Sequence, residues 1–307
     1  MNIHEYFQRT QEEFRSQNLN VLYYQLRQNS QICGDFQCAP AKARLHVYSI
    51  SKSFVSCACG IAVQEGLLSL DETISDSFRE HLPEMPSPYL LRLTPHHLLT
   101  MNSGLKDPLF FSDSPERYQL KDWISHFFHA DFTKEPGTDF LYSNLNTYIL
   151  SCLIEKRAGM NLLEYLRNRL FEPLEIGNPD WTLCPQGHVH AAFGLYLNID
   201  ELSRFGEMLR GNGLFEGKQL VPEEYMKQAF RNQTFSKDTF GSDAFRHGYG
   251  YQFWCTPVEG VRLCFGGYGQ FCLVWPKKDL VCSILSFEGK KPAAILDILL
   301  KYLPLLD

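Results

Sequence analysis

Tyr48–Cys59 reads Y-S-I-S-K-S-F-V-S-C-A-C and places Ser49 three residues before Lys52. On a helix, residues three apart lie on one face, so the Ser49 hydroxyl and the Lys52 amine would be neighbours. A serine becomes a good nucleophile when a base takes its proton, and a lysine is such a base when burial or nearby positive charge lowers its pKa. The segment Phe54–Val63 has no wide polar face, which predicts a buried helix behind both residues, with Gly66 as its C-cap. On its own, however, S-x-x-K is also a common helix-surface tetrapeptide.

The composition indicates a globular protein whose main partner is not a nucleic acid. The chain has 307 residues, enough for one large domain or two closely packed ones. Hydrophobic residues make up 44% and charged residues 21%, which is ordinary for a soluble protein. The formal net charge is −6 and no basic stripe is evident, which argues against nucleic acid binding.

The N-terminus and the cysteines predict a cytoplasmic protein without a membrane partner. Met1–Phe14 is polar and amphipathic, and it lacks the basic and apolar regions of a signal peptide. No apolar run approaches the length of a membrane span. The 10 cysteines are irregularly spaced and include no C-x-x-C pair, so we expect reduced and mostly buried thiols.

The order of the predicted elements favours an α+β fold. Strand-like runs lie near both ends of the chain, at Asn20–Arg27, Gln31–Gln37, Tyr249–Thr256, Val261–Cys264, Gln270–Trp275 and Leu280–Phe287. Amphipathic helices are expected at His4–Gln17, Leu120–His129, Asn146–Ala158, Leu162–Phe171, Ile199–Leu209, Pro222–Phe230 and Pro292–Tyr302. We therefore predict an antiparallel sheet flanked by N- and C-terminal helices (residues 1–67 and 191–307), interrupted by a helical subdomain (residues 68–190). The cleft between the two is the expected site.

A second group of polar residues lies in Glu135–Asn144, which reads E-P-G-T-D-F-L-Y-S-N. The P-G-T turn would deliver Tyr142 and Asn144 together ahead of a helix. A tyrosine near a lysine amine can relay protons, and an asparagine amide can orient a substrate carbonyl or the lysine. The alternative is structural, with Tyr142 a half-buried core residue and Asn144 a helix N-cap.

The third stretch is Phe265–Pro276, which reads F-G-G-Y-G-Q-F-C-L-V-W-P. Its glycines allow a ligand or another backbone to approach closely. An N–H in the turn formed by Gly266, Gly267 and Tyr268 would complete an oxyanion hole with the N–H of Ser49. A β-bulge or hairpin corner is the alternative explanation for these glycines.

No metal or other cofactor is expected. His188 and His190 could share one face of a strand as metal ligands, but no third ligand has a recognisable spacing.

Taken together, these motifs resemble the serine hydrolases related to class C β-lactamases, a family that includes penicillin-binding proteins, D-aminopeptidases, esterases and 6-aminohexanoate-dimer hydrolases. The resemblance extends from about Leu45 to about Phe287. The motifs that carry it, in order, are Ser49–Lys52, Gly66–Asp71, Leu98–Leu105, Pro136–Thr138 with Tyr142–Asn144, Gly194-Leu195 with Asp200–Gly206, and the glycine-rich strand with Trp275–Leu280.

The resemblance implies a β-lactamase/transpeptidase-like fold and assigns roles to the site residues. Ser49 would be the acylated nucleophile, Lys52 its base and Tyr142 the proton relay. Asn144 would hold the substrate amide or the Lys52 amine.

The chain departs from the family at the third motif, which is usually K-T-G or H-x-G. Here Val261–Phe265 leads into the glycines without a lysine or histidine. This departure is more similar to the esterase and oligomer-hydrolase branches, and it argues against recognition of a β-lactam or D-Ala carboxylate. Arg262 could replace the lost charge, although a strand arginine is more often simply exposed.

The sequence thus predicts a serine hydrolase that cleaves a small ester, amide or peptide through an acyl-enzyme. One alternative is a binding or sensor protein that keeps the fold with little turnover, and another is an acyltransferase. The substrate and the oligomeric state have no readable signal in the sequence.

Overall fold

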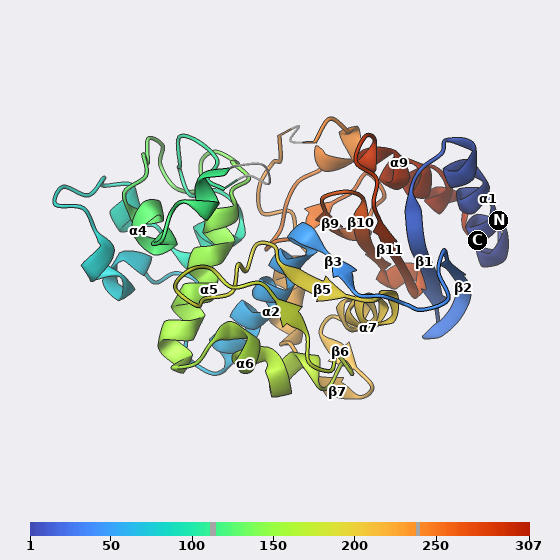
Figure 1. Cartoon of the computed structure of the whole chain (residues 1–307), viewed down its shortest axis with the longest axis horizontal. Helices are drawn as coiled ribbons and strands as arrows, with labels where there is room; N and C mark the ends of the chain where they lie inside the picture. The colour runs from blue at the N-terminus through green and yellow to red at the C-terminus, as the bar shows by residue number, and fades with distance from the viewer. Residues whose placement is uncertain (111–114, 238–239) are drawn as a thin grey trace.

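A six-stranded antiparallel sheet forms the centre of one half of the molecule. The computed structural model describes residues 1–110, 115–237 and 240–307. The strand order is β2-β1-β11-β10-β9-β8. The strands are β1 (Val21–Gln28), β2 (Gln31–Gln37), β8 (Trp254–Cys255), β9 (Arg262–Gly266), β10 (Gln270–Trp275) and β11 (Leu280–Ser286). Because β1 pairs with β11, the two ends of the chain share one sheet (Figure 1).

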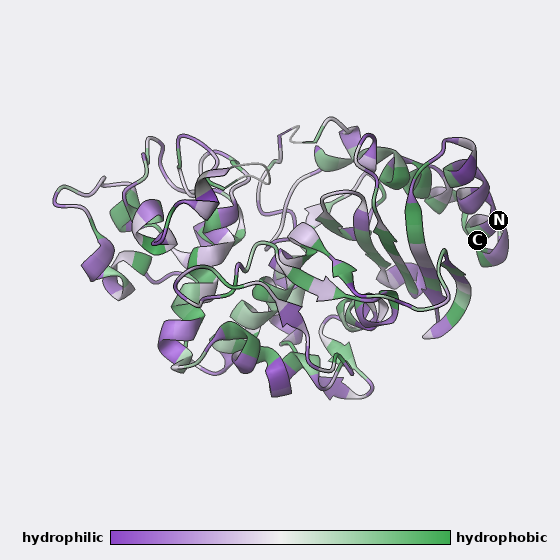
Figure 2. Cartoon of the chain, in the orientation of Figure 1, coloured by the Kyte–Doolittle hydropathy of each residue, from purple (hydrophilic) through white to green (hydrophobic). Residues whose placement is uncertain are grey.

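Helices cover both faces of this sheet, so every residue of its central strands β10 and β11 is buried. Alternate residues of a strand point to opposite faces. In β10, Phe271 and Leu273 join the cluster of α9 (Pro292–Tyr302), which packs on α1 (Ile3–Ser16). Cys272 and Val274 join the cluster on the other face, where α7 (Ile199–Arg210) packs on β10 and β11. Figure 2 shows the strands in green and the outer side of α1 in purple.

The second half of the molecule is helical and surrounds α2 (Ser51–Gln64). Every α2 residue from Ser51 to Ala62 is buried, as the absence of a wide polar face predicts, and Gly66 follows the helix with a φ of +70°. α2 packs on α5 and α8 and lies between the helices and the sheet in Figure 1. These two neighbours are α5 (Asn144–Ala158) and α8 (Glu223–Ala229), and α5 in turn contacts α3 (Pro95–Leu99), α4 (Trp123–Phe128) and α6 (Leu162–Leu166).

Two small sheets complete the fold. The first has the order β3-β5-β4, with β3 (Leu45–His46), β4 (Asp180–Trp181) and β5 (Leu195–Leu197). The second is the hairpin of β6 (Leu214–Phe215) and β7 (Lys218–Gln219). β3 pairs with β5 and ends two residues before the turn Tyr48–Ile50 that contains Ser49. The first sheet therefore positions the start of that turn.

The α+β fold class is confirmed, and one predicted strand is wrong. Of Tyr249–Thr256, only Trp254–Cys255 forms a strand. Gln252 has a φ of +65°, which breaks the extended run, and its N–H bonds to Leu99 O at 3.2 Å instead of joining the sheet. The division into residues 1–67 with 191–307 and residues 68–190 remains a proposal.

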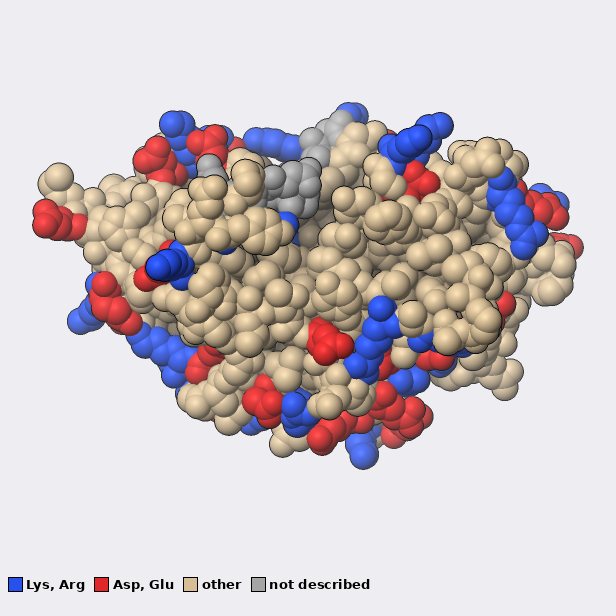
Figure 3. All heavy atoms as spheres, in the orientation of Figure 1, with Lys and Arg blue, Asp and Glu red and all other residues tan. Residues whose placement is uncertain are grey.

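The surface in view carries mixed charges. Figure 3 shows Lys and Arg side chains beside Asp and Glu along the lower edge, without a stripe of one sign on this face. Within the described residues, no helix is long and apolar enough to cross a membrane.

The end of β9 lies against the backbone just before Ser49. A Cβ on Gly266 would sit 2.2 Å from Val47 O, whereas a Cβ on Gly267 would have its nearest neighbour, the Tyr48 ring, at 3.5 Å. The first distance is a clash with backbone and the second is ordinary contact. The close approach that the glycines predict is therefore present, and it is made by the chain's own backbone.

We predict that Gly266→Ala lowers the free energy of unfolding by about 1–3 kcal/mol, because the backbone must shift to admit the methyl group. Gly267→Ala is the matched control and should remain close to wild type. Urea unfolding of the two variants measures the difference. Equal stability of both would contradict the packing argument.

Candidate active site

Ser49 and Lys52 lie at the start of α2 in contact with each other. A 3₁₀ turn, Tyr48–Ile50, precedes the helix, and Tyr48 has a φ of +49°, which is unusual for an aromatic residue. This sharp turn leaves Ser49 half-buried. The Lys52 amine follows one turn later, with Nζ 2.8 Å from Ser49 Oγ. The spacing S-x-x-K therefore produces the pairing that it predicts.

Lys52 is only 1% exposed, and three oxygens surround its amine. Besides Ser49 Oγ, these are Asn144 Oδ1 at 2.7 Å and Ala192 O at 2.9 Å. All three are uncharged, and no carboxylate in the described part of the chain forms an ion pair with Lys52. Burial without a counter-ion penalises the ammonium, and it holds the pKa of Lys52 well below its usual value.

Asn144 is fixed by a second hydrogen bond rather than acting as a helix cap. Its Nδ2 donates to Phe110 O, so Oδ1 is the atom that faces Lys52. Ser143 occupies the N-cap position of α5 and bonds to the Leu109 backbone, and Asn144 is the first residue of the helix. The helix thus starts two residues before its predicted beginning, and the structural alternative for Asn144 is wrong.

Tyr142 is buried and reaches the same serine. Its hydroxyl is hydrogen-bonded to Ser49, and Lys52 Nζ lies 4.8 Å from the centre of its ring. Burial raises the pKa of the Tyr142 phenol above its ordinary value, and the bond with Ser49 only partly offsets this. The phenol is therefore protonated at neutral pH. Ser49 lies between an amine whose pKa is lowered and a protonated phenol.

The structure separates the three residues predicted from the glycine-rich stretch. Gly267 and Tyr268 line a cavity of about 360 Å³ together with Ser49, Tyr142 and Asn144. Gly266 lies instead behind the nucleophile, against Val47 O. Tyr268 has a φ of +60°, and its ring lies 5.0 Å from that of Tyr48.

Among the further residues that line this cavity are three ionisable ones that no motif singles out: His46, Arg117 and Glu288. His46 lies in β3, and its Nε2 accepts the Gly194 N–H at 2.7 Å. Arg262, the arginine considered from the sequence, is not among the lining residues. Its guanidinium donates to the Phe230 and Val261 carbonyls.

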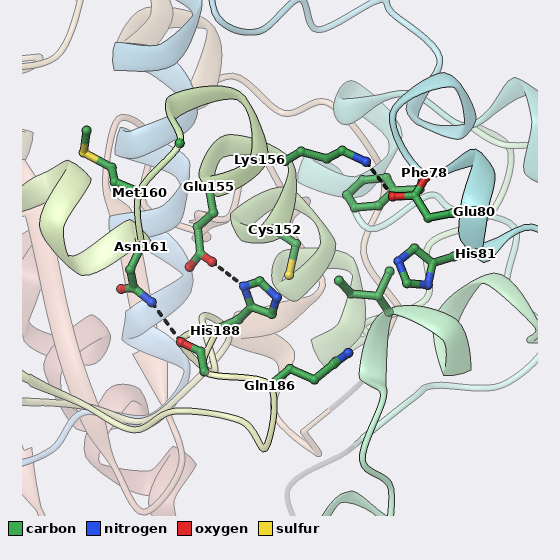
Figure 4. Close-up of a pocket in the computed structure, with 13 residues that line it drawn as sticks. Phe78, Glu80, His81, Cys152, Glu155, Lys156, Met160, Asn161, Gln186 and His188 are labelled. Carbon is green, nitrogen blue, oxygen red and sulfur yellow. Dashed lines mark hydrogen bonds and ion pairs between the residues drawn. The ribbon is translucent and has the colours of Figure 1, made fainter.

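A second cavity, of about 500 Å³, is lined by His188, the first histidine of the H-V-H pattern. Figure 4 shows His188 paired with Glu155 at its rim, beside Cys152. Glu155 is buried and also accepts the Leu162 N–H at 3.0 Å, so it links α5, α6 and the His188 loop. The Glu155 carboxylate raises the pKa of His188, against the opposing effect of burial.

The other histidine, His190, packs between rings and meets no metal-ligating cluster. Its ring centre lies 4.8 Å from that of Trp123 and 4.7 Å from that of Phe193. Across the described ranges, no group of three or more His, Cys, Asp or Glu residues is arranged to hold a metal ion.

Comparison with known proteins gives a family and a fold. A family model described as beta-lactamase matches residues 34–300. An uncharacterised protein of Alkalihalophilus pseudofirmus is 25% identical over 204 residues, which are 60% of this chain and 53% of that protein. The chain thus spans about half the length of this relative.

Two solved structures share the fold at low identity. The octameric penicillin-binding protein homologue from Pyrococcus abyssi superposes with a TM-score of 0.75 and 19% identity, covering 99% of this chain and 78% of that one. A family VIII carboxylesterase superposes with a TM-score of 0.74 and 15% identity, covering 97% and 98%. At such identities the likeness establishes the fold, including the β-lactamase-like arrangement that the resemblance implies.

We predict that His188→Gln lowers the melting temperature more at about pH 5.5 than at about pH 9. A histidine whose folded pKa is raised stabilises the protein fully below its unfolded pKa of about 6.5, and this stabilisation disappears as the pH rises through the folded pKa. Thermal unfolding at the two pH values measures the difference. The exposed His129→Gln is the control, and a His188 effect that does not change with pH would contradict the ion-pair argument.

Proposed function

The chain belongs to the beta-lactamase family, and we propose that it is a serine hydrolase in which Ser49 forms an acyl-enzyme with an ester or amide substrate. The observation that carries the proposal is the position of Ser49 Oγ. It lies 2.8 Å from a buried lysine amine, is hydrogen-bonded to a protonated tyrosine, and lines a cavity. These are the geometric requirements of an activated nucleophile.

Lys52 is the general base in this proposal, and a count of its hydrogens supports the role. A neutral amine has two N–H groups and one lone pair. Asn144 Oδ1 and Ala192 O are acceptors that cannot donate a hydrogen to nitrogen, so they take the two N–H groups. The lone pair then faces Ser49 Oγ and accepts its proton as the oxygen attacks the substrate carbonyl.

Tyr142 completes the proton path. Its phenol is protonated and in contact with Ser49 Oγ, so it can pass a proton to the departing alcohol or amine while Lys52 returns the serine proton to it. The N–H groups of Ser49 and of the Gly267–Tyr268 turn would hold the developing oxyanion. Attack by water on the acyl-enzyme then releases the acid and restores Ser49.

The substrate class remains a small ester, amide or peptide. The likeness to a carboxylesterase supports an ester as the first compound to test. Location in the cytoplasm is part of the same proposal. Its support is that all ten cysteines are free thiols and eight of them are buried, which suits a reducing compartment.

We predict a stoichiometric burst of p-nitrophenol when the protein is mixed with a short-chain p-nitrophenyl ester, followed by slower turnover. Ser49→Ala should show neither phase, because no acyl-enzyme can form. Stopped-flow absorbance measures both phases. Ser53→Ala is the control on the same helix, since Ser53 Oγ donates to Gln252 O at 3.0 Å and does not line the cavity. Identical traces for wild type and Ser49→Ala would favour a binding protein instead.

We predict that Lys52→Arg loses activity on the order of 10³-fold or more, because arginine keeps the positive charge but cannot give up its proton to act as a base. Lys42→Arg, at a lysine paired with Asp35 and Asp200, should keep wild-type rates. In the wild type, kcat/KM should rise with pH and level off below the usual lysine pKa of about 10.4, since the lowered pKa makes Lys52 neutral there. A rate in Lys52→Arg near that of wild type would remove Lys52 as the base.

A further inference from the structure

Arg117 brings a permanent positive charge to the wall of the cavity that contains Ser49. Among the described lining residues it is the one lysine or arginine. Its guanidinium carbon lies 5.2 Å from the centre of the Phe193 ring. Phe193 directly follows Ala192, whose carbonyl accepts from the Lys52 amine. The arginine is therefore attached, through one aromatic contact, to the segment that holds the proposed base.

Among the side chains that the structure describes, none neutralises the charge of Arg117. Its Nη2 donates to Tyr118 OH at 2.7 Å, and its carbon lies 4.7 Å from the centre of the Tyr118 ring. Its Nε is buried without a hydrogen-bond acceptor. No carboxylate whose side chain the structure describes, a set that does not include Glu116, forms an ion pair with this arginine. A buried donor on an unpaired cation is unfavourable unless a ligand satisfies it.

Glu288 also lines the cavity, but it is engaged elsewhere. Its carboxylate accepts the backbone N–H groups of Asn20 at 3.1 Å, Lys290 at 2.8 Å and Lys291 at 3.0 Å. Two of these donors lie just before α9 and the third just before β1, and together with the charge of Lys290 they lower the pKa of Glu288 despite its burial. The Glu288 carboxylate is thus held by backbone donors rather than by an ion pair with Arg117.

The histidines near Arg117 add a donor without adding a charge. Burial, and to a smaller extent Arg117, lower the pKa values of His46 and His190 to about 4, so both rings are neutral at pH 7. Since His46 Nε2 accepts the Gly194 N–H, its own proton is on Nδ1. The described lining thus combines one cation, Arg117, and one carboxylate, Glu288, with a neutral imidazole.

We propose that Arg117 is a specificity-determining residue that binds a carboxylate of the substrate, and that the preferred substrates are anionic esters or amides. Arg117 would then supply, from a different segment, the positive charge that the third motif lacks. A charge-assisted bond from a guanidinium to a carboxylate is shorter and stronger than a neutral one, and a water-poor cavity strengthens it further. This inference rests on the proposed function.

The test compares anionic esters with neutral esters of the same size. p-Nitrophenyl hydrogen glutarate and p-nitrophenyl valerate place a carboxylate or a methyl group at the end of the acyl chain. 4-Acetoxybenzoate and 4-acetoxybenzamide place a carboxylate or a neutral carboxamide on the leaving group. The quantity measured is the ratio of kcat/KM for the anionic and neutral members of each pair, which does not depend on the fraction of folded enzyme.

In the wild type, at least one pair should show a ratio above one, and Arg117→Gln should lower that ratio by about 10- to 100-fold. Arg117→Lys should restore part of the ratio, because the lysine ammonium keeps the positive charge but cannot form the two parallel hydrogen bonds of a guanidinium. Arg262→Gln is the matched control, and its ratio should equal that of wild type. Unchanged ratios in Arg117→Gln, or an equal fall in Arg262→Gln, would overturn the inference.

A binding measurement separates this inference from the proposed function. Ser49→Ala should bind the preferred anionic ester more tightly than its neutral partner, and the double variant Ser49→Ala/Arg117→Gln should lose that difference in calorimetric titration. Turnover without any Arg117-dependent preference would refute the inference while leaving the hydrolase proposal intact. Arg117-dependent binding without turnover would refute the hydrolase proposal and leave the binding of a carboxylate by Arg117 intact.

Discussion

The burial of the Lys52 amine is the constraint on which the site depends. An ammonium without a counter-ion is strongly disfavoured away from water, so burial alone shifts Lys52 toward its neutral form. The fold must then provide oxygen acceptors for that amine, and it takes them from distant segments, with Asn144 at the start of α5 and Ala192 before β5. Removing either acceptor would leave a buried N–H group unpaired, so both segments are held in place by the same side chain.

The second constraint is the approach of two backbones behind the nucleophile. Gly266 leaves no room for a side chain against Val47 O, and this contact attaches the sheet to the turn that carries Ser49. The left-handed conformation of Tyr48 is the other consequence, since the chain must reverse within a few residues to pass from β3 into α2. The conformational strain at Tyr48 is retained because the neighbouring rings of His46 and Tyr268 pack on its side chain.

The sequence was informative wherever short-range spacing determines geometry. The pairing of Ser49 with Lys52 follows from one helical turn, and β10 and α9 follow from apolar runs with clear ends. The role of Asn144 was left open, because an asparagine before a helix suits an N-cap as well as a lysine partner, and only the position of Phe110 O distinguishes the two. Arg117 and Arg262 show the limit more sharply. The arginine nearest the third motif along the chain turns away to backbone carbonyls, and the one in the cavity lies in a segment without a motif.

An anionic substrate and a neutral lysine base place opposite demands on one cavity. A carboxylate brought close to Lys52 on its own would favour the ammonium form and thereby remove the base. If Arg117 binds that carboxylate as proposed, the two groups form a pair without net charge, which favours the ammonium form of Lys52 less than an unpaired carboxylate would. The aromatic ring of Phe193 supports the arginine on the same loop that presents Ala192 O to the lysine. Recognition of the substrate and maintenance of the base would then depend on one short segment, residues 190–194, and a change in its conformation would affect both together.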